Sequence, residues 1–175
     1  DDSLSVAHRI LGATYLFKRQ HEQAVAEMER AITLDPSDAL GYLELGATLV
    51  WAGRAEEGIG LIKRGMRLDP RNPALYLQRL GWAYRVAGRC EDSIAALQQV
   101  LSLTPAFIPS RVNLVVCYVE LGREEEARAE ATEVLRLNPS VSVEDMWRKE
   151  NQPFKDDPMP ILERLYAAAR KAGLK

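Results

Sequence analysis

The sequence predicts an all-α solenoid in which helix-turn-helix units stack one on another. The first observation is a set of four prolines, 34, 35 and 34 residues apart, each preceded by an apolar and a polar residue: Pro36, Pro70, Pro105 and Pro139. The second is that Leu-Gly pairs recur in step, with each glycine 24 residues before its proline. A period of this length is the signature of stacked repeats, because each unit can bury its apolar face only against its neighbours.

The period divides the chain into four units at residues 3–36, 37–70, 71–105 and 106–139. In the second unit, Leu45 and Leu49 are followed by a break at Gly53, and a second helix is expected after it. A glycine after an apolar helical run supplies the left-handed residue that ends a helix. Gly88 and Gly122 predict the same break in the third and fourth units. The first unit has no glycine at this point, so its turn departs from the pattern.

Two motif positions are predicted to lie in the core of every unit. One holds the recurring leucine, which is Leu11, Leu45, Leu80 and Leu114. The other requires a small residue between close helices, and holds Ala24, Gly58, Ser93 and Ala127. The one extra residue of the third unit is expected in the loop at 71–73.

Three glycines within one expected helix, Gly58, Gly60 and Gly65, allow two interpretations. They either permit close backbone packing or make a soft joint, because each interior glycine costs about 0.8–1.0 kcal/mol relative to alanine.

Residues 140–175 carry no further repeat and are predicted to cap the array. Ser142 and Asp145 resemble a capping box before a short helix, and three prolines between 151 and 160 predict an irregular strap. An amphipathic helix is expected from about Pro160 to Gly173. A solenoid needs a cap with one polar side. The alternative is that the strap or the final helix lies in the groove of the array and gates it.

The phased Leu-Gly and proline motifs resemble the tetratricopeptide repeat, a 34-residue helix-turn-helix unit. The resemblance covers residues 3–139. It implies a right-handed solenoid whose concave surface is lined by the first helix of each unit and which acts as a non-enzymatic protein-protein interaction scaffold. Some family members hold a C-terminal carboxylate with a Lys/Asn clamp. The matching positions here are Arg9, Ala13 and Glu44, so that clamp is not expected.

The resemblance implies a mostly apolar peptide-binding groove, with Phe17, Trp51 and Trp82 as anchors. Such a wall suits an amphipathic helix or an extended apolar peptide. Alternatively, these aromatic side chains pack between units or under the tail. The groove positions are Arg9, Phe17, Leu43, Val50, Trp51, Gln78, Arg79, Trp82, Arg85, Val86, Val112, Asn113 and Val116.

A second, weaker resemblance concerns the segments 75–84 and 153–174, which are similar to C-terminal tetratricopeptide regions of bacterial signalling proteins. Those regions often follow an adenylate or guanylate cyclase domain or a winged-helix DNA-binding domain. The resemblance implies a regulatory or sensory C-terminal region acting intramolecularly or by self-association. The chain begins with Asp1, which indicates an excised or processed piece.

Composition excludes several other classes of function. The 175 residues are 47% hydrophobic and 27% charged with a net charge of −2, which is typical of a globular protein and not of a nucleic-acid-binding one. No apolar run is long enough to span a membrane. The two cysteines are too few for a disulfide scaffold and predict free thiols in a reducing compartment, hence a cytoplasmic location.

Catalytic and metal-binding residues are sparse. His8 and His21 are 13 residues apart, unlike the i, i+4 pair of a helical zinc site. Cys90 starts an expected helix, which predicts a lowered pKa. We therefore expect no catalytic residues, no cofactor, no metal, and no nucleic-acid or membrane partner. The expected partner is a protein or peptide, a segment of the parent protein, or a second copy.

Overall fold

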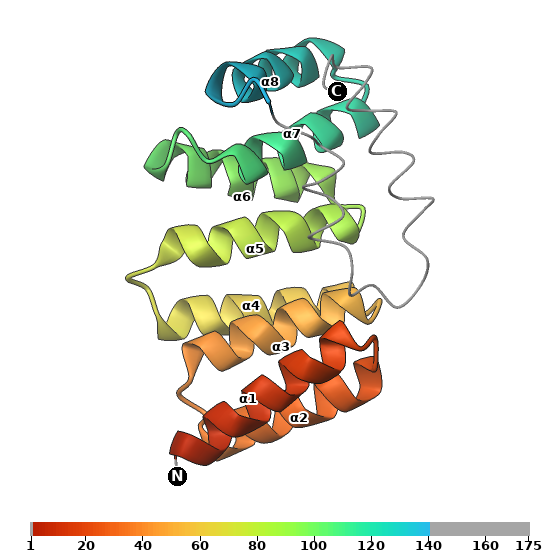
Figure 1. Ribbon diagram of the computed structural model, residues 1–175. Helices are drawn as coiled ribbons and strands as arrows, with labels where there is room; N and C mark the ends of the chain where they lie inside the picture. The colour runs from red at the N-terminus through yellow and green to blue at the C-terminus, as the bar shows by residue number, and fades with distance from the viewer. Residues whose placement is uncertain (1, 141–175) are drawn as a thin grey trace.

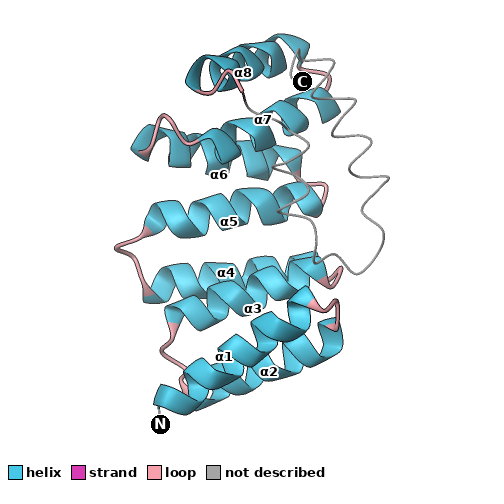
Figure 2. Ribbon diagram, in the orientation of Figure 1, coloured by secondary structure: helices cyan, strands magenta, loops and turns pink. Residues whose placement is uncertain are grey.

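The computed structural model describes residues 2–140, which form eight α-helices and no strands (Figures 1 and 2). The helices are α1 (Asp2–Phe17), α2 (His21–Leu34), α3 (Ala39–Trp51), α4 (Ala55–Leu68), α5 (Pro73–Val86), α6 (Cys90–Leu103), α7 (Ile108–Glu120) and α8 (Glu124–Leu137). The predicted tail helices, the strap and its gating of the groove lie outside the described residues.

The helices form one continuous stack of four antiparallel pairs, running in Figure 1 from α1 and α2 at the bottom to α7 and α8 at the top. Each pair packs against the next, since α2 contacts α3, α4 contacts α5, and α6 contacts α7. The first helices also touch one another, α1 with α3, α3 with α5, and α5 with α7. The predicted all-α solenoid is confirmed. Its first helices share one side of the stack, where the candidate site lies.

The turn inside each pair has the same backbone geometry in all four units. Gly53, Gly88 and Gly122 have φ of +83°, +73° and +73°. After α3, the N–H of Arg54 donates to the carbonyl of Leu49, and that of Gly53 donates to Val50. These are the two hydrogen bonds of a Schellman motif, which satisfies carbonyls left free at a helix end.

The first unit makes this turn without a glycine. Arg19 takes the left-handed conformation with a φ of +58°, and it is the only described non-glycine residue with a positive φ. Its N–H donates to the carbonyl of Leu16, while that of Gln20 donates to Tyr15, which repeats the pattern of the other units. The solenoid therefore imposes on an arginine a conformation that glycine adopts without strain.

Close backbone packing accounts for two of the three glycines in α4. A Cβ on Gly58 would collide with the carbonyl oxygen of Gly46, and one on Gly65 would lie 2.7 Å from the carbonyl oxygen of Ala39. A Cβ on Gly60 would meet nothing within 4 Å. Gly58 and Gly65 thus let α4 approach α3 closely, whereas Gly60 only lowers helix propensity.

The recurring leucine is buried in three units, but the prediction is wrong for the first. Leu45, Leu80 and Leu114 are at most 3% exposed, whereas Leu11 is 40% exposed. Leu45 packs with Val25 and Met28 of α2, the second helix of the preceding unit. Leu11 is exposed because no described helix precedes α1. The small-residue positions, by contrast, are buried in all four units.

The extra residue of the third unit lengthens a helix. The loops between units, 35–38, 69–72 and 104–107, have equal lengths, while α5 has 14 residues against 13 in α3 and in α7. The expectation that the extra residue lies in the loop at 71–73 is therefore wrong. Pro73 is instead the first residue of α5. The fixed φ of proline suits the first helical position, where its missing N–H leaves no hydrogen bond unmade.

Candidate binding groove

Three first helices surround a hollow of about 280 Å³ on one side of the stack. Its lining is Ala13, Leu16 and Phe17 of α1, Met28 of α2, Leu40, Leu43, Glu44, Ala47, Thr48 and Trp51 of α3, and Leu75 and Arg79 of α5. We call it the α1–α3–α5 hollow. Four of the predicted groove residues, Phe17, Leu43, Trp51 and Arg79, contribute to this one wall.

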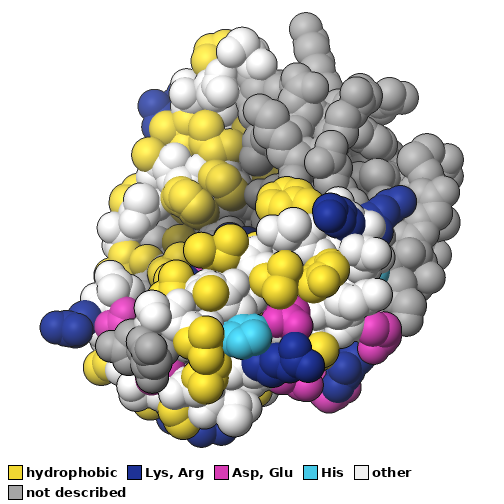
Figure 3. Space-filling view, turned by 60° about the horizontal axis from the view of Figure 1, so that its bottom comes forward, with side chains coloured by type: hydrophobic (Ala, Val, Ile, Leu, Met, Phe, Trp, Pro, Cys, Tyr) yellow, Lys and Arg dark blue, Asp and Glu magenta, His cyan; other side chains and the backbone are white. Residues whose placement is uncertain are grey.

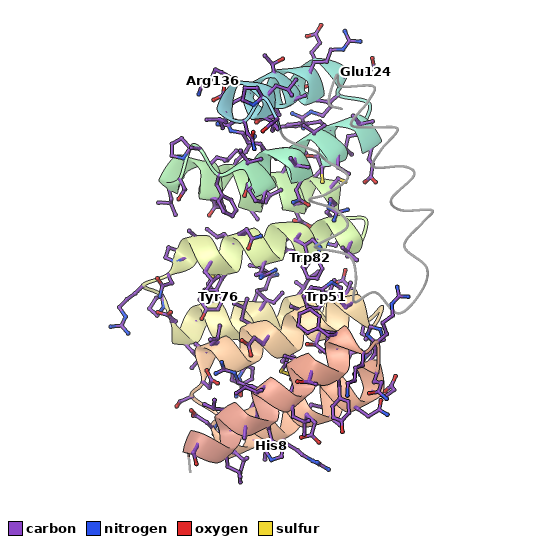
Figure 4. The ribbon with its side chains drawn as sticks, in the orientation of Figure 1. His8, Trp51, Tyr76, Trp82, Glu124 and Arg136 are labelled. Carbon is purple, nitrogen blue, oxygen red and sulfur yellow. The ribbon has the colours of Figure 1, made fainter. Side chains whose placement is uncertain are left out.

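The three predicted aromatic anchors differ in exposure. Trp51 and Trp82 lie together, with ring centroids 5.2 Å apart and planes at 53° (Figure 4). Trp82 is 4% exposed and belongs to a core cluster shared by the second and third units. Trp51 is half-buried against that cluster, and its buried indole N–H has no acceptor among residues 2–140. Phe17, at the end of α1, is 77% exposed. Of the three, Phe17 presents the most surface to solvent.

The predicted aliphatic positions lie mostly beneath the surface. Leu43, Val50, Val112 and Val116 are buried, while Val86 keeps partial exposure. Leu43 and Val50 join the same cluster as Trp82, so they hold α3 against the third unit. Among the hollow's lining, the well-exposed apolar side chains are therefore Phe17, Leu40 and Leu75.

Two predicted groove arginines are engaged within the protein. Arg9 donates to Asp38 at 2.8 Å and to Glu44 at 2.9 Å. Burial lowers the pKa of Arg9, but these two carboxylates outweigh it and raise the pKa overall. Arg85 is buried and donates to the side-chain oxygen of Asn113 at 2.7 Å, and the amide of Asn113 donates to a backbone carbonyl of α7.

Arg79 is half-buried on α5 in the wall of the α1–α3–α5 hollow, next to Gln78, also half-buried. Within residues 2–140, no hydrogen bond or ion pair holds its guanidinium. Glu44, which also lines the hollow, is already bonded to Arg9. The hollow thus combines an apolar surface with one cation that has no partner in the described part of the chain.

A second hollow, of about 440 Å³, lies between α1 and α2 and was not predicted. It is lined by Leu4, His8, Ala26, Glu29, Arg30, Thr33 and Leu34. His8 of α1 is paired through Nδ1 with Glu27 of α2. Figure 3, which brings this end of the stack forward, shows apolar side chains around a histidine side chain. Because His8 and Glu27 are 19 residues apart in the chain, no local sequence pattern predicts that they pair.

The structure places the possible metal ligands and the Cys90 thiol. Residues 2–140 contain no group of three His, Cys, Asp or Glu side chains that could hold a metal ion. The expectation of a lowered pKa at Cys90 is wrong. Its hydrogen bond to Cys117, its burial and the carboxylate of Glu120, which accepts from Sγ at 2.9 Å, raise the pKa of the Cys90 thiol. These effects outweigh the lowering of the pKa that the start of a helix favours, because a Cys90 thiolate would be buried beside the negative charge of Glu120.

No described helix combines the length and the apolar character that crossing a bilayer requires.

Family models described as tetratricopeptide repeat match residues 85–147 and residues 10–38. Comparison with curated proteins finds no match. Among solved structures, a MamA protein aligns with a TM-score of 0.69 at 18% identity over 98% of this chain and 94% of that one. PilF of Pseudomonas aeruginosa aligns with a TM-score of 0.69 at 22% identity over 98% of this chain and 74% of that one. MamA from Desulfovibrio magneticus RS-1 aligns with a TM-score of 0.69 at 14% identity over 95% and 94%. Similarity at these identities establishes the fold alone.

Proposed function

Because the chain belongs to the tetratricopeptide repeat family, which indicates a protein-interaction scaffold, we propose that it binds a peptide or helix of a partner protein in the α1–α3–α5 hollow. The observation that carries the proposal is an apolar wall built from three first helices and ending at the exposed Phe17. Apolar grooves between helices are suited to apolar peptide segments, which bury side chains in them and displace water.

Exposure supports the hollow over the rest of the predicted groove. Phe17, Leu40 and Leu75 are 77%, 39% and 41% exposed and line one concavity, so a ligand could cover them together. Exposed apolar groups that gather around a concavity are typical of interaction sites. A buried side chain such as Val50, which packs in the same core cluster as Leu43, would support the site without touching the ligand.

On this proposal the chain acts by binding and not by catalysis. The two resemblances and the predicted free thiols support a cytoplasmic role in bacterial signalling, in which the ligand is a segment of a protein partner or of the parent protein. Self-association is the alternative use of the same apolar surface.

The test is selection of random peptides displayed on phage against the purified chain, comparing wild type with Phe17→Ser. We expect wild type to select peptides, and Phe17→Ser to bind them about thirtyfold more weakly, corresponding to the ~2 kcal/mol of an aromatic hot spot. Leu103→Ser is the matched control, because Leu103 is 57% exposed at the end of α6 and lies outside the hollow. Equal binding by wild type and Phe17→Ser would refute the proposal for this hollow.

A further inference from the structure

We propose that Cys90 and Cys117 are a redox modification site, at which a small-molecule disulfide converts the two thiols into one reversible disulfide bond. They are the two cysteines of the chain. Cys90 is the first residue of α6 in the third unit, and Cys117 lies in α7 of the fourth. A bond between them would join two adjacent units covalently. This site is independent of peptide binding in the α1–α3–α5 hollow, because neither cysteine lines that hollow.

The two thiols are already in contact. They are hydrogen-bonded to each other, and both are buried in the core cluster that packs α6 against α7. A disulfide forms only between cysteines whose side chains face each other at short range, because the geometry of the bond is narrow. The fold thus holds side by side two sulfurs that an unfolded chain would bring together only rarely.

The groups around the pair suit the two sulfurs to different steps. Sγ of Cys90 donates to the carboxylate of Glu120 at 2.9 Å, and Glu120 is exposed at the end of α7, so Cys90 is the thiol nearer to solvent. The hydrogen bond from Cys90 lowers the pKa of the Cys117 thiol, and Ser93 and Arg85 add to this effect against the opposing effect of burial. Because the thiolate is the nucleophile in disulfide exchange, Cys117 is suited to close the bond.

The reaction consists of two thiol–disulfide exchanges. The sulfur of Cys90 attacks one sulfur of the small disulfide, its proton passes to Glu120, and the small thiolate that leaves takes up that proton. The sulfur of Cys117 then attacks the sulfur of Cys90 in the mixed disulfide and expels the second small thiolate, which takes up the proton of Cys117. The S–S bond of the small disulfide and two S–H bonds break, and one S–S bond and two S–H bonds form. The cysteines lose two electrons, and the small disulfide gains them.

Such a bond is compatible with thiols that are normally reduced. Disulfides in reducing compartments are typically transient and respond to a change in the ratio of small disulfides to thiols. The raised pKa of the Cys90 thiol keeps it protonated and slow to react at rest. Once formed, the bond would hold α6 to α7 and restrict movement of the third unit relative to the fourth.

The experiment equilibrates the purified chain with mixtures of reduced and oxidised glutathione, in native buffer and in concentrated urea, starting from the reduced and from the oxidised chain. Acid quenching, alkylation of free thiols and mass spectrometry of the intact chain give the fraction with an internal disulfide. We expect this bond to be at least about thirtyfold more stable against reduced glutathione in the native protein than in urea, which corresponds to ~2 kcal/mol of stabilisation by the cross-link.

The single-cysteine variants Cys90→Ser and Cys117→Ala are the controls. Each should form only a mixed disulfide with glutathione, and thermal unfolding shows whether each is folded. Their mixed disulfides also provide the mass that distinguishes an internal bond from glutathione attached to wild type.

Two results with wild type would overturn the proposal. An internal disulfide that is no more stable in native buffer than in urea would mean that the fold does not favour the bond. Mixed disulfides with glutathione, or dimers linked through cysteine, in place of the internal bond would mean that the two sulfurs do not react with each other. Either result would leave the peptide binding proposed for the hollow standing, because that binding is tested at Phe17.

Discussion

At the scale of single residues, position in the solenoid can override intrinsic preference. Arg19 has a φ of +58° although its side chain favours negative φ, because the turn between α1 and α2 must close in the same way as the turns at Gly53, Gly88 and Gly122. The hydrogen bonds of the turn hold the arginine in place. The conformational strain at Arg19 should therefore be relieved by glycine.

We expect Arg19→Gly to stabilise the protein by about 1 kcal/mol, since glycine adopts a positive φ at little cost. Urea unfolding followed by circular dichroism would measure the gain. Gln20→Gly is the matched control, because Gln20 has a φ of −91° and glycine there should only increase the entropy of the unfolded chain. A loss of stability in Arg19→Gly would mean that contacts of the arginine side chain outweigh the backbone strain.

At the scale of helices, the packing of α3 against α4 depends on missing side chains. Gly46 and Gly58 face each other so closely that each would place a Cβ against the other's carbonyl oxygen. Gly60, two residues further along α4, faces open space and makes no such contact. The close-packing interpretation therefore applies to Gly58 and Gly65, whereas Gly60 makes no close contact that offsets its cost in helix propensity.

We expect Gly58→Ala to destabilise the protein by about 1–3 kcal/mol through overpacking, and Gly60→Ala to stabilise it by up to about 1 kcal/mol through helix propensity. Chemical unfolding of the two variants would measure both changes. Amide exchange should further show slower exchange in α4 of Gly60→Ala than in wild type, if that glycine softens the helix. If Gly58→Ala and Gly60→Ala changed the free energy of unfolding in the same direction and by the same amount, the different roles assigned to the two glycines would be contradicted.

At the scale of the whole molecule, each unit depends on the one before it. The recurring leucine is buried where a second helix precedes it, as Leu45 is by α2, and is 40% exposed at Leu11. The first helix consequently presents Ile10, Leu11 and Phe17 to solvent. The same residue type at the same motif position thus serves as core in three units and as surface in one.

We expect Leu45→Ala to cost about 2–5 kcal/mol by leaving a cavity in the core, and Leu11→Ala to cost about 0.5 kcal/mol or less. Thermal unfolding of the two variants would test this, since the repeat position and the chemical change are identical. A similar cost at both positions would show that Leu11 is buried in solution, for example by a second copy of the chain.

The sequence by itself determined the helices, the turns and the stacking of the four pairs, because these follow from local spacing. Period, glycine breaks and apolar faces act within one unit or between adjacent ones, and the helices begin and end close to where these signals place them. Leu11 and Arg19 departed from the pattern. The exposure of Leu11 depends on which helix packs against its unit, and the left-handed conformation of Arg19 depends on the turn that its unit must close.

Only the tertiary structure decided which of the predicted groove positions are exposed. The sequence assigned Val50, Trp82 and Arg79 to the same concave surface, yet Val50 and Trp82 are buried between units while Arg79 lines an open hollow. The pairing of Arg9 with Glu44, 35 residues away, and the absence of such a partner for Arg79 among the described residues are likewise invisible in the sequence. Exposure and pairing depend on side chains that neighbouring units contribute, and these change from one repeat to the next while the backbone period stays the same.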